Sequence, residues 1–160
     1  MSELNRREFI LATGVAAVSL MSLPVLQSAA HAQAAPTSMP TAPVDVGLLS
    51  SFDKDGVTQT FSKKPNYLYI VRQDGKLFAC RSLCTHKGRP LTVKDTEFYC
   101  PTHHSEFSFQ GTVTHGPAQT SLPRYAISTD DNGHVVVDCT KEFSEKNWDD
   151  AASFVAIKPA

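Results

Sequence analysis

The sequence predicts an antiparallel all-β domain, and three observations support this fold class. From residue 45 onward, apolar side chains recur with a period of two rather than the 3.6 of a helix. Two pairs of such segments flank short turns that contain glycine, which is the pattern of a β-hairpin. Beyond that residue there is no convincing amphipathic helix, apart from one or two turns within residues 144–152.

Two hairpins form the framework of the predicted domain. The first joins residues 67–71 to residues 76–80 through a Gln-Asp-Gly turn, in which glycine adopts positive φ at little cost. The second joins residues 124–128 to residues 134–138 through an Asp-Asp-Asn-Gly turn, a strong hairpin signal. Shorter strands are expected at 47–52, 57–61, 97–100 and 106–109.

The first 32 residues (1–32) have the organisation of an export signal. Arg6 and Arg7 precede an apolar stretch that ends in small residues. The arginine pair, followed by Phe9, resembles the twin-arginine (Tat) signal that bacteria use to export proteins already folded. We expect cleavage before Gln33 and a mature protein in the periplasm.

A retained anchor is the alternative for the same segment. Residues 9–30 are 22 in number, and about 20 apolar residues span a bilayer. If the segment is kept, the protein would lie on the periplasmic side of the inner membrane. Residues 33–44, rich in Ala, Pro, Ser and Thr, are expected to form a flexible linker to the domain, which spans 45–140. The tail, 141–160, is expected to pack on that domain.

Charge and cysteine content restrict the function. The chain has 15 Lys and Arg residues against 16 Asp and Glu residues, for a net charge of −1 at pH 7. Proteins that bind nucleic acid usually present a basic face, so no nucleic-acid partner is expected. Four cysteines are too few for a fold built on disulfides, but they suffice for one metal site or two bridges.

Two short pairs of metal-ligand residues lie between the hairpins. Cys84 and His86 form a Cys-x-His pair, and Cys100 and His103 form a Cys-x-x-His pair, with 13 residues between the two pairs. Each tight turn presents a sulfur and an imidazole to the same side, and the intervening segment can bring the two turns together. Thiolate and imidazole ligands favour an iron–sulfur cluster or zinc over calcium or magnesium.

At these residues the sequence resembles the Rieske iron–sulfur family. The resemblance continues through Ser105, Phe107, Gly111, Gly116-Pro117-Ala118, Leu122-Pro123-x-Tyr125 and Asn132-Gly133. It implies an antiparallel β-sandwich or barrel with a loop-rich cluster-binding subdomain at 82–118. It also implies one Rieske 2Fe-2S cluster. In it, Cys84 and Cys100 would bind one iron through their thiolates, and His86 and His103 would bind the other through ring nitrogen.

The ligand set has a direct electrostatic consequence. Two ferric ions, two sulfides and two thiolates make a neutral oxidised centre, whereas four thiolates would leave it with two negative charges. An added electron meets less repulsion in the neutral centre, so its reduction potential is higher. A structural zinc module remains the alternative from another class, because a Cys2His2 set also binds zinc, although zinc sites usually contain Cys-x-x-Cys.

Several positions near the predicted cluster determine its environment. Ser105 stands where high-potential Rieske proteins have a serine that donates a hydrogen bond to the cluster, whereas Phe107 stands where many have tyrosine. An intermediate potential is therefore expected. Arg89 and Thr102 replace the two cysteines that bridge the loops in those relatives. His104 replaces a glycine, and a positive φ there would strain histidine by about 1 kcal/mol.

The remaining cysteines leave two alternatives open. Cys80 and Cys139 each end a predicted strand, and they could form a disulfide or be two small buried residues. His115 and His134 are expected to be surface histidines rather than ligands. Trp148 is expected to pack the tail onto the sheet.

The expected function is that of an exported one-electron carrier without a catalytic site of its own. The expected partner is a redox protein, and three kinds fit. A c-type cytochrome would suit a free carrier. The large subunit of a periplasmic molybdenum oxidoreductase such as arsenite oxidase would make this chain its small subunit. A quinol-oxidising complex of the cytochrome bc type would make it the Rieske subunit, with the retained segment as its tether.

Overall fold

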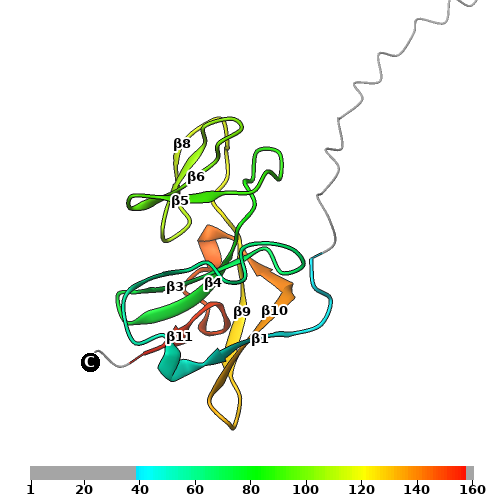
Figure 1. Cartoon of the computed structure of the whole chain (residues 1–160), viewed down its shortest axis with the longest axis vertical. Helices are drawn as coiled ribbons and strands as arrows, with labels where there is room; N and C mark the ends of the chain where they lie inside the picture. The colour runs from blue at the N-terminus through cyan, green and yellow to red at the C-terminus, as the bar shows by residue number, and fades with distance from the viewer. Residues whose placement is uncertain (1–38, 158–160) are drawn as a thin grey trace, which may run out of the picture. The chain divides into compact units, whose positions relative to one another are not determined.

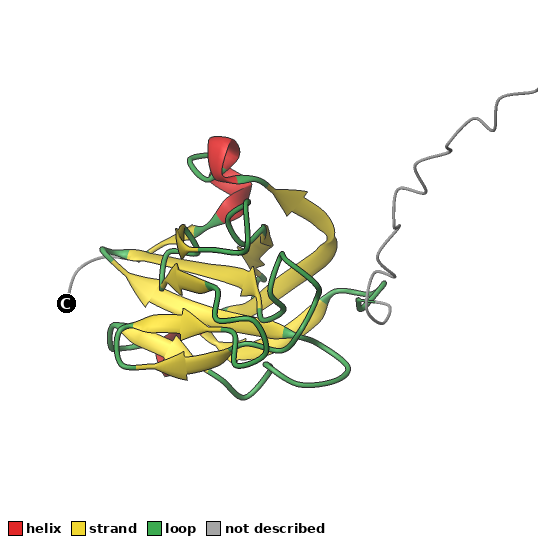
Figure 2. Ribbon diagram, turned by 90° about the horizontal axis from the view of Figure 1, so that it is seen from above, coloured by secondary structure: helices red, strands yellow, loops and turns green. Residues whose placement is uncertain are grey.

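Residues 39–157, which a computed structural model describes, fold into two antiparallel β-sheets (Figure 1). The predicted export signal, residues 33–38 of the predicted linker and residues 158–160 lie outside this range. Strands make up nearly all of the regular structure, and helix is confined to short turns (Figure 2). The predicted all-β class is confirmed. Within the described residues, no helix is both long enough and apolar enough to cross a membrane.

The larger sheet has seven strands in the order β1-β10-β9-β4-β3-β2, and β11 pairs with β4. The strands are β1 (Val44–Leu48), β2 (Gly56–Thr58), β3 (Leu68–Gln73), β4 (Lys76–Arg81), β9 (Arg124–Thr129), β10 (His134–Phe143) and β11 (Val155–Ala156). Both predicted hairpins form, as β3 with β4 and β9 with β10. The second hairpin is longer than predicted because β10 continues past a bulge to pair again with β9 at its far end.

The predicted strand at 47–52 is wrong in its bounds. The strand is Val44–Leu48, and Leu49–Ser51 form the 3-10 turn η1. The Asp45 carboxylate accepts a hydrogen bond from the Gly47 N–H at 2.8 Å, and the pairing with β10 shifts register between these residues. This bulge, with glycine at φ +105°, bends the strand, and pairing ends soon after it. The apolar residues that follow therefore continue in a turn.

A smaller sheet lies within the segment predicted to be rich in loops. Its four strands are β5 (Thr92–Lys94), β6 (Glu97–Tyr99), β7 (Glu106–Ser108) and β8 (Val113–His115), paired in that order. In Figure 1 this sheet forms a separate layer above β3 and β4. The strands β6 and β7 correspond to the predicted strands at 97–100 and 106–109, whereas β5 and β8, which are equally short, were not predicted.

The β3–β4 hairpin is buried on both faces. Leu68 and Ile70 belong to one apolar core, which also contains residues of β1, β9 and β10. Tyr69 and Val71, which point the other way, belong to a second core formed with the smaller sheet. The ring of Tyr69 stacks on Phe98 of β6 with centroids 4.5 Å apart. Burial on both faces explains why this hairpin has a nearly continuous apolar sequence.

The two remaining cysteines are free thiols in different cores. Cys80 is fully buried in the core beside the smaller sheet, and Cys139 is buried in the core on the other face. Burial raises the pKa of the Cys80 thiol to about 12 and that of the Cys139 thiol to about 11. Of the two alternatives, the structure therefore has the pair of small buried residues and not the disulfide.

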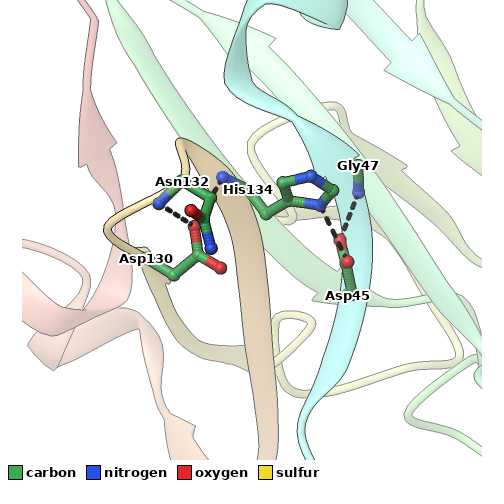
Figure 3. Close-up of polar contacts among 5 residues, drawn as sticks. All are labelled: Asp45, Gly47, Asp130, Asn132 and His134. Carbon is green, nitrogen blue, oxygen red and sulfur yellow. Dashed lines mark hydrogen bonds and ion pairs between the residues drawn. The ribbon is translucent and has the colours of Figure 1, made fainter.

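Two carboxylates stabilise the part of the larger sheet formed by β1 and the β9–β10 turn (Figure 3). Asp45 of β1 contacts the His134 ring of β10, with Oδ2 and Nδ1 2.8 Å apart. In the β9–β10 turn, the Asp130 side chain accepts hydrogen bonds from the backbone N–H groups of Asn132 and His134, at 2.9 and 2.8 Å. These contacts hold the turn and fasten the edge strand β1 to its neighbour.

The segment after β10 returns to the larger sheet. It forms the 3-10 turns η2 (Glu145–Asn147) and η3 (Ala151–Ser153) before β11. Trp148 lies over the guanidinium of Arg124, whose other side faces the Phe78 ring; the Cζ atom is 4.3 and 3.7 Å from the two ring centroids. Burial lowers the pKa of Arg124 to about 10.

Candidate metal centre

Two loops at one end of the second core carry the predicted cluster ligands, and a third loop contacts both of them. The first loop, residues 82–91, closes on itself because the N–H of Cys84 donates to the Arg89 carbonyl and the N–H of Gly88 donates to the Cys84 carbonyl, both at 2.8 Å. In the second loop, residues 100–105, the N–H of Cys100 donates to the Ser105 carbonyl at 2.9 Å. Each loop thus contains a tight turn that begins at a cysteine, Cys84 in the first loop and Cys100 in the second.

The two thiols lie together in the interior. Cys84 is 2% exposed and Cys100 is fully buried, and both belong to the second core. Burial raises the pKa of the Cys84 thiol, and the neighbouring Cys100 raises it further. Hydrogen bonds from the His86 backbone and the Ser105 hydroxyl act in the opposite direction. Desolvation disfavours the thiolate form of both cysteines, and a cationic group between them would stabilise both thiolates.

The two imidazoles lie together nearer the surface. The rings of His86 and His103 are perpendicular, with centroids 4.8 Å apart, and each residue is only partly buried. The Nδ1 atom of each ring is buried and has no hydrogen-bond partner among residues 39–157. A buried imidazole nitrogen without a partner is costly, and both atoms have the chemistry of metal ligands.

These four residues fit a binuclear cluster as two pairs of ligands. Within residues 39–157, no group of three or more Cys, His, Asp or Glu side chains surrounds a single ion position. The structure brings together the sulfurs as one pair and the imidazoles as another. The donor set is that of the Rieske cluster, in which two histidines replace two cysteines on one of the two irons.

Ser105 lies where a hydrogen bond to the sulfur ligands is possible. The side chain is fully buried, and its hydroxyl contributes to lowering the pKa of Cys84. The same oxygen accepts a hydrogen bond from the Ala118 N–H at 3.0 Å, which ties the third loop, residues 116–122, to the second. Phe107, also fully buried, belongs to the same core but presents no polar atom.

Further contacts around the loops were not predicted from the sequence. The Tyr69 hydroxyl donates to the Leu91 carbonyl at 2.7 Å and anchors the base of the first loop to β3. The Thr85 hydroxyl donates to the Thr120 carbonyl at 2.6 Å and joins the first loop to the third. A tyrosine in a strand and a threonine between two ligands have no sequence pattern that signals such roles.

His104 adopts the strained backbone conformation considered above. Its φ is +62°, in the left-handed region that favours glycine. Its Nδ1 atom pairs with the Tyr99 hydroxyl at the end of β6. This contact fastens the second loop, which has no bridging cysteine at Thr102.

The surface around the imidazoles is positive. Burial lowers the pKa of His103, and neighbouring positive groups lower it further, namely His86, Lys87, Arg89 and His104. Lys87 and Arg89 are exposed and lie in the same tight turn as His86.

Comparisons with known proteins agree on one family. The Rieske [2Fe-2S] domain model matches residues 42–126. The chloroplast cytochrome b6-f complex iron-sulfur subunit 1 of Nicotiana tabacum is 36% identical over 85 residues, which cover 51% of this chain and 37% of that subunit. The corresponding subunit of Prochlorococcus marinus is 32% identical over 96 residues, which cover 58% of this chain and 51% of that subunit. The matches thus span about half or less of these relatives.

A solved structure also shows similarity. The plasma-membrane Rieske protein PetC3 from Synechocystis PCC 6803 is 28% identical, and the alignment covers 59% of this chain and 97% of that one with a TM-score of 0.45. The family model covers more than half of the chain described here. The chain therefore belongs to the Rieske [2Fe-2S] family and binds one Rieske [2Fe-2S] cluster.

Proposed function

We propose that the cluster is bound by the two pairs of residues described above and that the protein is a one-electron carrier. Cys84 and Cys100 would bind one iron, and His86 and His103 the other. The observation that carries this proposal is the pair of buried, unpartnered Nδ1 atoms beside two buried thiols. When bound, the cluster accepts and releases a single electron.

The protein residues have distinct tasks in this function. The second core keeps water away from the thiolates, because Phe98 and Phe107 are fully buried beside them. Ser105 supplies a hydrogen bond to the sulfur side of the site. The imidazoles are only partly buried, so they lie between the cluster and the surface and offer a partner a short path for the electron.

Metal analysis and pulsed EPR test the ligand assignment. We expect two iron and two sulfide ions per chain, and nitrogen coupling from two histidines in the reduced protein, as a Rieske [2Fe-2S] cluster requires. His103→Ala should lose the cluster, whereas His115→Ala, at an exposed histidine of β8, should keep it. Bound zinc without sulfide, or a cluster without nitrogen coupling, would overturn the assignment.

The place of this carrier in the cell is part of the same proposal. A domain that receives its cluster before export must cross the membrane folded, and the arginine pair Arg6-Arg7 suits the twin-arginine route. We therefore propose a periplasmic carrier, and its redox partner is a c-type cytochrome or a molybdenum oxidoreductase large subunit. N-terminal sequencing of the protein from periplasm should begin at Gln33, and Arg6→Lys with Arg7→Lys should block export.

A second candidate function rests on the relatives. The Nicotiana tabacum and Prochlorococcus marinus relatives are iron-sulfur subunits of the cytochrome b6-f complex, which favours a Rieske subunit of a quinol-oxidising complex. In that case residues 9–30 would remain as an anchor and the protein would stay with the membrane fraction. An intact N-terminus and co-purification with a cytochrome b would establish this function and exclude the free carrier.

A further inference from the structure

The loops that carry the imidazoles have a charge unlike that of the whole chain. Acidic residues slightly outnumber basic ones in the sequence. The loops themselves, residues 82–91 and 100–105, contain Lys87 and Arg89 and not one Asp or Glu, and Lys94 follows in β5 directly before Asp95. A surface with positive groups and no negative ones attracts anions over about 10 Å at low ionic strength.

Two of these basic groups are free to meet a partner. Lys87 and Arg89 are exposed, and neither forms an ion pair with a carboxylate within residues 39–157. Elsewhere in the described fold basic side chains do form such pairs, for example Arg72 with Asp55 and Lys141 with Asp138. Lys94 differs, because its ammonium lies 5.0 Å from a ring centroid in β6.

Backbone geometry places both charges beside the imidazoles. The hydrogen bonds that close the first loop hold Lys87 and Arg89 in the same turn as His86. His86 in turn contacts the His103 ring. Apart from His104, the other exposed residues of the second and third loops, including Pro101, Thr102 and Pro117, have no ionisable side chain. The two imidazoles are therefore bordered by the positive charges of Lys87 and Arg89.

We propose that this surface docks a redox protein whose cofactor lies beneath an acidic face. The proposal rests on the proposed function, since it concerns the partner that exchanges an electron through the imidazoles. Carboxylates on the partner would steer the encounter toward Lys87 and Arg89, and a partner with a basic face would be repelled. An anionic membrane is the weaker match, because membrane-binding clusters usually contain about four to eight basic residues.

Oxidation of the reduced holoprotein by two inorganic probes tests the charge. One electron passes from the protein to hexacyanoferrate(III), giving hexacyanoferrate(II), or to tris(phenanthroline)cobalt(III), giving the cobalt(II) complex. The rate with the anionic probe should fall as salt is added, and the rate with the cationic probe should rise. Lys87→Gln and Arg89→Gln should each lower the ratio of anionic to cationic rate by about twofold to tenfold at low salt, whereas Lys54→Gln should not.

The ratio of the rate with the anionic probe to the rate with the cationic probe separates an effect on docking from an effect on the reduction potential. A change in the potential of the cluster alters both rates in the same direction. Poly-L-glutamate should slow oxidation by the anionic probe in the wild type, but not in the variant that combines Lys87→Gln with Arg89→Gln. Equal ratios in all variants would overturn the acidic partner but leave the carrier intact, whereas failure to reduce either probe would overturn the carrier itself. Binding to phosphatidylserine vesicles that requires Lys87 and Arg89 would overturn the protein partner in favour of a membrane.

Discussion

The hydroxyl of Ser105 accepts a hydrogen bond from the backbone N–H of Ala118 at 3.0 Å. The serine thus joins the loop that carries Cys100 to the loop that carries Ala118, and its own proton remains available to the sulfur of Cys84. One buried side chain therefore connects two loops and the proposed ligand sphere.

Ser105→Ala should lower the reduction potential. A hydrogen bond donated to a sulfur stabilises the more negative, reduced state, so its loss favours the oxidised state. Protein-film voltammetry measures the shift directly. Ser128→Ala, at an exposed position of β9, is the control and should leave the potential unchanged. An unchanged potential in Ser105→Ala would show that this hydroxyl does not reach the cluster.

Phe107→Tyr should raise the potential. The fully buried ring lies in the core that contains Cys84 and Cys100, so an added hydroxyl can supply a further donor there. The same voltammetric measurement applies. Phe109→Tyr, which adds a hydroxyl two residues further on, should produce no comparable rise. If the two variants behave alike, position 107 has no special relation to the cluster.

Tyr69→Phe should reduce the free energy of unfolding by about 1–3 kcal/mol, because the Leu91 carbonyl would lose its buried hydrogen-bond donor. Ring stacking on Phe98 would be retained, so the change isolates the hydroxyl. Urea unfolding of the holoprotein provides the measurement. Tyr67→Phe removes a hydroxyl from a neighbouring buried tyrosine and is expected to cost less. Loss of the cluster at lower denaturant concentration should accompany the effect at Tyr69.

Stability should fall in acid partly through Asp45. The backbone N–H of Gly47 and the contact with His134 hold the pKa of this carboxyl below its ordinary value of 3.8. A carboxyl group with a lowered pKa stabilises the folded state above its unfolded-state pKa, and this contribution disappears as the pH falls through the folded-state value. Asp45→Asn should therefore destabilise the protein at pH 7.

The same variant should lose less stability than the wild type between pH 7 and about pH 3. Urea titrations at the two pH values measure this difference. Asp131→Asn, at an exposed position of the β9–β10 turn, is the control and should follow the wild type. A parallel loss of stability in Asp45→Asn and the wild type would contradict the assignment.

The fold class and the proposed ligands could be predicted from local sequence. Apolar residues with a period of two and Asp-Gly or Asn-Gly turns are decided within a few residues, which is why both long hairpins were predicted. The two Cys–His pairs were recognisable because tight turns place neighbouring side chains on one side.

Other features depended on contacts between distant segments. The bulge at Asp45 comes from pairing with β10, and the separation of Cys80 from Cys139 comes from the two faces of one sheet. Neither relationship has a local sequence signal, because each depends on which segments pack together in three dimensions.

The sequence by itself determined the all-β class, both long hairpins and the types of the proposed ligands. Only the tertiary structure decided that the imidazole Nδ1 atoms of His86 and His103 are buried side by side without a hydrogen-bond partner. It also decided that Tyr69 and Thr85 hold the loops. The physical reason is that a hydrogen bond across 20 or more residues depends on the packing of both cores, which no short stretch of sequence specifies.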